Sequence, residues 1–238
     1  MGPVYLLTLR QLSGRWRLVI MTVLATLPVG LALLAVVFDN QAPPVEEFEM
    51  LAFSGMLVGI IMPLIVLAIA ASAFANELDD RTIANLTLAP IPRWQIVVPK
   101  LLAAVTLAAP FIAASAFATA YIGFLGDWRT SIAVTVSALA GVALYGAAFL
   151  WLGLMSTQAI GIGLLYIVIW EGFFAGFVEG VRLLSLRYYA LGIMHALDER
   201  RFASISLLSP TAAIAVSVVV FTVFVLLAIR RLRRMDIP

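Results

Sequence analysis

Residues 50–75 read MLAFSGMLVGIIMPLIVLAIAASAFA, a run of 26 residues that contains no charged side chain. A helix rises about 1.5 Å per residue, and about 20 apolar residues are enough to cross the hydrocarbon core of a bilayer. Strands of a membrane β-barrel would instead show short segments in which polar and apolar residues alternate. This stretch therefore predicts a membrane-spanning helix, and with it an all-α integral membrane protein.

The composition of the whole chain points to the same class. Of the 238 residues, 63% are hydrophobic and 12% are charged, whereas soluble domains are about half apolar and about a quarter charged. The chain has no cysteine, which excludes disulfides, thiolate metal sites and cysteine nucleophiles. The first apolar run, residues 18–38, is longer than the core of a cleavable signal peptide, so we expect it to be a retained span.

We interpret residues 1–238 as a single transmembrane domain with six spans. The uncharged run over residues 130–170 has 41 residues and is too long for one crossing. Its most polar point is Met155-Ser156-Thr157-Gln158, where we expect a tight turn between two spans. The expected spans cover residues 18–38, 50–75, 101–126, 131–154, 159–178 and 207–229.

The distribution of basic residues predicts the orientation. Lys and Arg concentrate on the cytoplasmic side of membrane proteins. If both termini are cytoplasmic, that side carries ten of the 15 basic residues, and the first outer loop, residues 39–49, carries four acids and no base. We therefore expect a multi-pass protein of the cell membrane with both termini in the cytoplasm.

The sequence carries no recognisable catalytic motif. Lys100 is the only lysine, and Val97-Val98-Pro99 before it lack the glycines of a phosphate-binding loop. His195 is the only histidine, so a zinc-binding pair is excluded, and we expect it to be a polar residue of the outer segment. No Gly-x-Ser-x-Gly nucleophile elbow occurs. We expect no enzymatic activity, no metal site, no cofactor in this chain and no nucleic-acid partner.

The stretch between the second and third spans, residues 76–100, reads NELDDRTIANLTLAPIPRWQIVVPK. Acids at its start suit a helix N-terminus, and Pro90 and Pro92 end that helix. Arg93 and Trp94 follow, where residues that anchor a chain at the membrane interface are common. The residues alone favour a solvated loop with an interfacial helix over a docking element for a cytoplasmic partner.

This stretch resembles the coupling region of the type-2 ATP-binding cassette (ABC) transporter permeases. In that family a Glu after the second span is followed by a small residue and Thr, by leucines, by a Pro and an Arg, and by Gly-Lys before the third span. Two positions depart from the pattern, because Arg81 and Pro99 stand where glycine is usual. The matching residues are Glu77, Thr82, Leu86, Leu88, Pro90, Arg93 and Lys100.

The six-span layout extends the resemblance over the whole chain. It implies the membrane-spanning permease subunit of an ATP-driven exporter, with a cytoplasmic coupling helix between spans two and three and a re-entrant outer segment between spans five and six. ATP and Mg²⁺ would bind to a separate ATP-binding subunit, and a second permease copy or a homologous permease would complete the dimer in membrane lipid. The residues implied in docking the ATP-binding subunit are Glu77, Asp80, Arg81, Thr82, Pro90 and Arg93.

Glu171 is the only acid within an otherwise apolar stretch. A charge inside the membrane is costly, so such a residue usually faces a cavity or a partner. Glu171 either lines the pathway or pairs with Arg182 or Arg187, or it lies at the outer interface where span five ends. An ion-coupled carrier or channel subunit is the alternative function, but such proteins usually bury several ionisable groups, and Glu171 is the one candidate here.

The segment over residues 181–202 mixes apolar residues with Arg182 and Arg187. This pattern predicts one or two amphipathic helices at the outer surface. They form either a gate over the exit or a surface cap, and the pattern slightly favours the cap. Few polar groups occur along the spans, which hints at a lipidic or amphipathic cargo.

Overall fold

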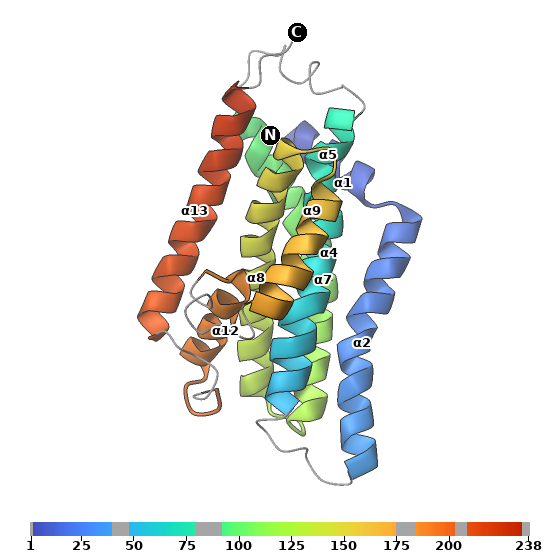
Figure 1. The fold of residues 1–238 in the computed structure, drawn as a ribbon. Helices are drawn as coiled ribbons and strands as arrows, with labels where there is room; N and C mark the ends of the chain where they lie inside the picture. Colours follow the sequence, from blue (N-terminus) through green and yellow to red (C-terminus); the bar gives the residue numbers. More distant parts are fainter. Residues whose placement is uncertain (1, 40–47, 80–91, 175–183, 203–208, 235–238) are drawn as a thin grey trace.

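The computed structural model describes residues 2–39, 48–79, 92–174, 184–202 and 209–234, and these residues are mostly helical, with no strand among them (Figure 1). Five helical stretches are long and apolar enough to cross a membrane. The elements are α1 (Gly2–Leu12), α2 (Arg15–Asp39), η1 (Glu49–Ile61), α4 (Met62–Ala70), α5 (Ser72–Asp79), α7 (Trp94–Gly123), α8 (Trp128–Met155), α9 (Ala159–Leu165), η2 (Tyr166–Phe174), α12 (Leu186–Leu197) and α13 (Pro210–Arg234).

The centre of the bundle is the continuous rod η1–α4–α5, packed with α7 and α8. Most residues of this rod are buried, which fits its nearly unbroken apolar sequence. Figure 1 shows α2 and α13 on opposite sides of this centre, and fewer than a quarter of the residues in their most apolar stretches are buried. Water would not tolerate this much apolar surface, but a bilayer solvates it.

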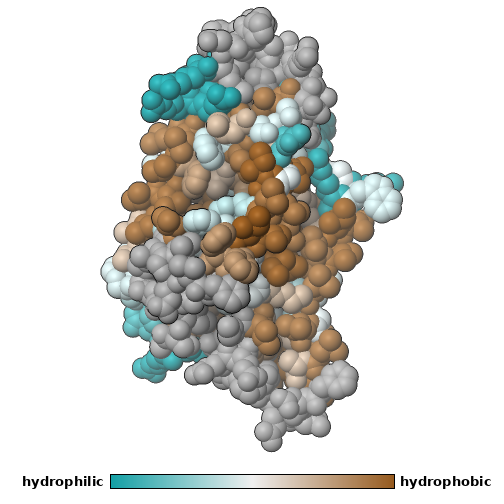
Figure 2. Space-filling view, viewed as in Figure 1, coloured by the Kyte–Doolittle hydropathy of each residue, from teal (hydrophilic) through white to brown (hydrophobic). Residues whose placement is uncertain are grey.

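The two ends of the bundle are polar. Figure 2 shows an apolar band across one face, with hydrophilic residues gathered toward its ends. Figure 1 places α1 and the last turn of α13 at the same end, which we call the arginine-rich end. The described arginines of α1, α2 and α13 that define this end are Arg10, Arg15, Arg17, Arg230, Arg231, Arg233 and Arg234.

The third span begins at Trp94 rather than at residue 101. Its expected start was set by the charge of Lys100, but this lysine is buried and ion-paired inside the bundle, so its charge does not end the helix. The helix ends at Gly123 because Leu125 and Gly126 adopt positive φ angles of 51° and 90° in the turn that follows. Gly126 takes such a φ without the steric penalty that a side chain brings.

The turn predicted at residues 155–158 is confirmed. Helix α8 ends at Met155, Ser156 is extended, and its hydroxyl accepts a hydrogen bond from the backbone N–H of Gln158 at 3.0 Å. The helix that follows, α9–η2, is described only over residues 159–174. These 16 residues are fewer than a span needs, and residues 175–178 lie outside the described part, so the count of six spans stays a prediction.

Two further helices complete the bundle. Helix α1, which the sequence pattern did not predict, packs on α7, and the Tyr5 and Thr106 hydroxyls lie 3.1 Å apart. The amphipathic helix expected within residues 181–202 is confirmed as α12. Its inner face, which includes Tyr189, Leu191 and Met194, is buried, and α12 packs against α8 and α13, so it is part of the bundle.

Candidate functional site

A buried ion pair joins α5 to α7 near the arginine-rich end. The Nζ atom of Lys100 donates to Glu77 Oε1 at 2.5 Å and to the carbonyl oxygen of Ala73 at 2.6 Å. The Phe74 ring lies 4.4 Å from the same nitrogen. The Lys100 side chain is only 1% exposed, and the Glu77 side chain is 13% exposed. An ammonium group this deeply buried needs such partners, because removal from water is costly.

This pair joins the two helices that flank the predicted docking segment. Glu77 lies in the last turn of α5, and Lys100 lies in the second turn of α7. One buried contact therefore connects the last turn of α5 to the beginning of α7. We call Glu77, Lys100, Ala73 and Phe74 the α5–α7 clamp.

Of the other predicted docking residues, Arg93 is the one that the structure describes. Arg93 precedes α7, and its carbonyl oxygen accepts hydrogen bonds from the backbone N–H groups of Ile96 and Val97, both at 3.1 Å. Trp94, beside it, is 42% exposed, as an interface residue would be. Asp80, Arg81, Thr82 and Pro90 lie outside the described residues.

A second polar cluster surrounds Glu171, inside the bundle. The Glu171 side chain is fully buried, and its carboxylate accepts hydrogen bonds from the Tyr145 hydroxyl at 3.0 Å and the Tyr166 hydroxyl at 2.8 Å. It also accepts hydrogen bonds from the Ser185 hydroxyl and, at 3.0 Å, from the backbone N–H of Leu186. Leu186 is the first residue of α12, so the carboxylate interacts with a helix N-terminus, which favours negative charge.

Glu171 is therefore enclosed by the bundle, because no part of its side chain is exposed, and whether it lies along the pathway or at the depth of the outer interface stays a prediction. Arg187 reaches the backbone carbonyl oxygen of Glu171 at 3.5 Å and donates to the Ser54 hydroxyl at 2.7 Å. Arg182, the other expected partner, lies outside the described residues. The cluster thus connects η1, α8, η2 and α12.

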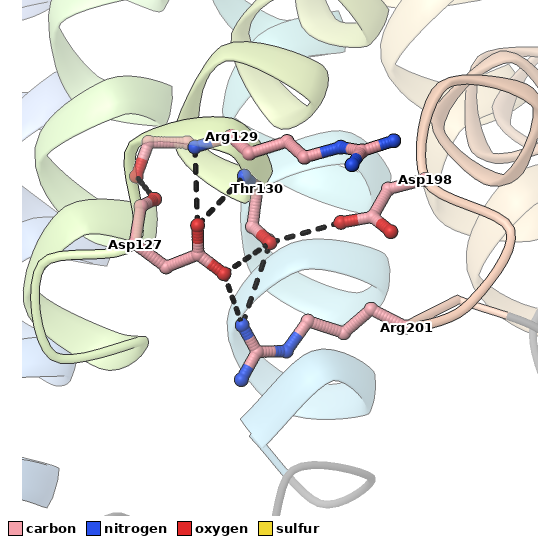
Figure 3. Close-up of polar contacts among 6 residues, drawn as sticks. Asp127, Arg129, Thr130, Asp198 and Arg201 are labelled. Carbon is pink, nitrogen blue, oxygen red and sulfur yellow. Dashed lines mark hydrogen bonds and ion pairs between the residues drawn. The ribbon is translucent and has the colours of Figure 1, made fainter.

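A third cluster closes the opposite end of the bundle, and Figure 3 shows it. Asp127 caps α8, because its carboxylate accepts hydrogen bonds from the backbone N–H groups of Arg129 at 3.1 Å and Thr130 at 3.4 Å. Arg201 donates to the same carboxylate at 2.6 Å. The Thr130 hydroxyl lies 2.9 Å from both Asp127 Oδ2 and Asp198 Oδ2, and its single hydrogen serves one of them at a time.

The environment lowers the pKa of the Asp127 carboxyl from its usual value. Partial desolvation acts in the opposite direction, but hydrogen bonds from Thr130 and from the Arg129 backbone, together with the charge of Arg201, favour the ionised form and prevail. Arg201 also lies over the Phe124 ring at 4.6 Å. The cluster therefore ties the start of α8 to the chain that follows α12.

Sequence reasoning named Glu77, Lys100 and Glu171 but missed most of their partners. Tyr166 and Glu171 are five residues apart, which places them on different faces of an α-helix. In η2 the turns are wider and close at about five residues, so these two side chains meet. His195, expected in the outer segment, lies in the last turn of α12.

The comparisons with known proteins agree with this architecture. A family model described as ABC-2 family transporter protein matches residues 10–186, which is more than half of the 238 residues. A search of curated proteins gives no match. The matched region contains the α5–α7 clamp and Glu171. The chain is thus a transmembrane transport protein, and it belongs to the ABC-2 family of transporter proteins.

Proposed function

We propose that this chain is the membrane-spanning permease subunit of an ATP-driven exporter. It forms the translocation path, and a separate ATP-binding subunit holds ATP and Mg²⁺ and supplies the energy. A second copy of the chain, or a homologous permease, completes the path. The permease crosses the cell membrane six times, and the arginine-rich end, with both termini, faces the cytoplasm, as the distribution of basic residues predicts.

The observation that carries this proposal is the α5–α7 clamp in a chain of the ABC-2 family. The docking segment, from Asp80 to Arg93, joins the two helices that the clamp connects. Closure of the ATP-binding subunits pushes on this segment. The clamp passes that movement to α5 and α7 as a unit and so biases the bundle between inward-facing and outward-facing states.

Co-purification from the native host tests the docking step. The tagged wild-type chain should retain a subunit that carries a phosphate-binding loop, and the complex should hydrolyse ATP. We expect the variant Arg81→Glu/Arg93→Glu to lose most of this subunit while it still inserts into the membrane. Glu77 is left unchanged in this variant because its replacement would also break the buried pair with Lys100.

The matched control is Arg129→Glu/Arg200→Glu, which makes the same change of charge at exposed residues of the opposite end. It should retain the ATP-binding subunit. Equal retention by both variants would contradict docking through residues 80–93. Transport driven by a proton gradient in vesicles that contain only this chain would instead support the ion-coupled carrier.

A further inference from the structure

An aromatic cavity lies between α13 and the α9–η2 helix, on the side of the bundle away from α2. Its volume is about 420 Å³, and α8 and α12 complete its walls. In Figure 1, α13 lies at the left edge of the bundle, on the side opposite α2. Among the described residues, six aromatic side chains line it: Phe149, Trp151, Tyr166, Trp170, Tyr189 and Phe224.

The chemistry of the walls is almost entirely apolar. None of the described residues that line the cavity is charged, and the Tyr166 hydroxyl is directed to Glu171, so this residue presents mainly its ring to the cavity. Ile162 and Leu184 at the rim are 44% and 66% exposed, so the cavity opens on the outer surface of the bundle. Cavities of this size with aromatic walls are typical of ligand sites.

The cavity lies at the depth of the hydrocarbon core. Val220, which lines it, is ten residues before Arg230, and therefore about 15 Å along the helix from the arginine-rich end. The hydrocarbon core is about 30 Å thick. The exposed residues of α13 and α9 on either side, such as Val219 and Leu165, are also apolar. At this depth the molecules that reach the rim are lipid chains and other membrane helices.

The volume distinguishes between these two occupants. A helix with its side chains is about 10 Å across, so about 420 Å³ would hold only about one turn of it. An acyl chain is a single file of methylene groups and can enter along its length. Entry from lipid gains little from the hydrophobic effect, so the preference for the cavity comes from close contact with the fixed aromatic rings.

We propose that this cavity binds one acyl chain of a bilayer phospholipid, held between α13 and α9–η2 against the aromatic walls. The bound chain fills the cavity between these helices. Tyr166 is both a wall of this site and a donor to Glu171, so the lipid site adjoins the polar cluster that holds η2 to α8 and α12.

Photolabelling tests this proposal. The purified wild-type chain is placed in nanodiscs of dioleoyl phosphatidylcholine that contain a small fraction of a phosphatidylcholine with a diazirine in one acyl chain. After illumination, adducts are mapped by mass spectrometry. We expect labelling of three residues that line the cavity, Leu152, Val220 and Phe224, to saturate as the photoreactive fraction rises. Labelling of Val219 and Leu226, which face the bilayer, should rise in proportion to it. Proportional labelling of both sets would overturn the proposal and indicate bulk lipid only.

Two variants complete the test. Leu152→Trp adds a ring inside the cavity and should abolish the saturable labelling, while Val219→Trp adds the same ring on the exposed face of α13 and should preserve it. Saturable labelling that persists in Leu152→Trp would place the chain elsewhere. Because the protein has no cysteine, Val220→Cys provides a unique thiol. Efficient disulfide formation between copies of this variant would show that a second copy covers the cavity, which would also overturn the proposal.

Discussion

Glu171 is a buried carboxylate whose position is fixed by donors from separate helices. Tyr145 comes from α8, Tyr166 from η2, and the Leu186 N–H from the start of α12. A buried carboxylate is costly unless hydrogen bonds replace its hydration, and here these three donors and the Ser185 hydroxyl do so. The residue therefore holds three helices at a fixed spacing, in addition to any role in transport.

Substitutions at this cluster should distinguish the contribution of the carboxylate to stability from the contributions of its individual partners. Glu171→Ala leaves several buried donors without their acceptor and should lower the free energy of unfolding by about 3 kcal/mol. Glu171→Gln keeps one acceptor oxygen, and Tyr145→Phe removes one donor, so each should cost about 1 kcal/mol. Thermal unfolding in detergent measures the order of these effects on stability. Glu199→Ala, at an exposed acid, is the control, and an equal effect of Glu171→Ala and this control would contradict a structural role for the cluster.

Asp127 should make the folded protein less stable at acidic pH than at neutral pH. Its pKa in the folded protein is lowered from the ordinary 3.8, so the ionised form stabilises the fold above that value, and the contribution is lost as pH falls through the lowered pKa. Asp127→Asn keeps an oxygen that can cap α8 but loses the pairing with Arg201. The difference in melting temperature between wild type and this variant should be present at about pH 7 and should shrink as the pH falls below 3.8 and through the lowered pKa. A difference that persists in strong acid would show that charge is not its cause.

At the scale of helices, α8 approaches the α4–α5 junction closely at Gly153. A Cβ atom there would lie 2.3 Å from the carbonyl oxygen of Ala71, so α8 would have to move. Gly153→Ala should therefore lower the free energy of unfolding by about 2 kcal/mol, although alanine is the better helix former. Gly161→Ala is the matched control, since no atom lies within 4 Å of its added Cβ, and it should stabilise α9 slightly. Equal effects of the two variants, measured by thermal unfolding, would refute the close approach.

The helices that the sequence predicted well are those whose apolar runs end in polar residues or turns. The spans over residues 50–75 and 131–154 match because their charge-free stretches coincide with helices. The hydropathy pattern gave the wrong start for the third span, because Lys100 was taken for the end of the apolar run. Its partner Glu77 lies 23 residues earlier in the chain and becomes its neighbour only through packing. Helix α1 was not predicted because a short amphipathic helix has no long apolar run.

The sequence was enough to single out the key residues of the candidate sites, but not to predict which residues contact them. Glu171 stood out as a lone acid, but its donors are common tyrosines and serines that no pattern separates from ordinary packing residues. The Ser185 hydroxyl and the Leu186 backbone N–H, which also donate to it, lie 14 and 15 residues later in the chain, so local sequence does not link them to Glu171. Tyr166 meets it because the helix there is wider than an α-helix, a geometry that hydrophobic periodicity does not encode.

For the molecule as a whole, the sidedness of the bundle follows from the path of its helices. In Figure 1, α2 descends from the arginine-rich end, η1–α4–α5 returns to it, α7 descends and α8 returns. Helix α13 ends at the arginine-rich end, so the chain between α8 and α13 reverses direction through α9–η2 and α12. Six membrane crossings, with α9–η2 in the fifth, would account for this path.

This path predicts which introduced thiols share a side of the membrane. The natural chain has no cysteine, so each single replacement is a unique probe. Gly2→Cys and Arg234→Cys lie at the arginine-rich end and should react with a membrane-impermeant maleimide in inside-out vesicles. Leu125→Cys, in the turn between α7 and α8, should react only in right-side-out vesicles, since this 65% exposed residue lies at the opposite end. Labelling of Gly2→Cys and Arg234→Cys from opposite sides would require an odd number of crossings and would exclude the six-span path, because the two ends of a chain share a side only after an even number.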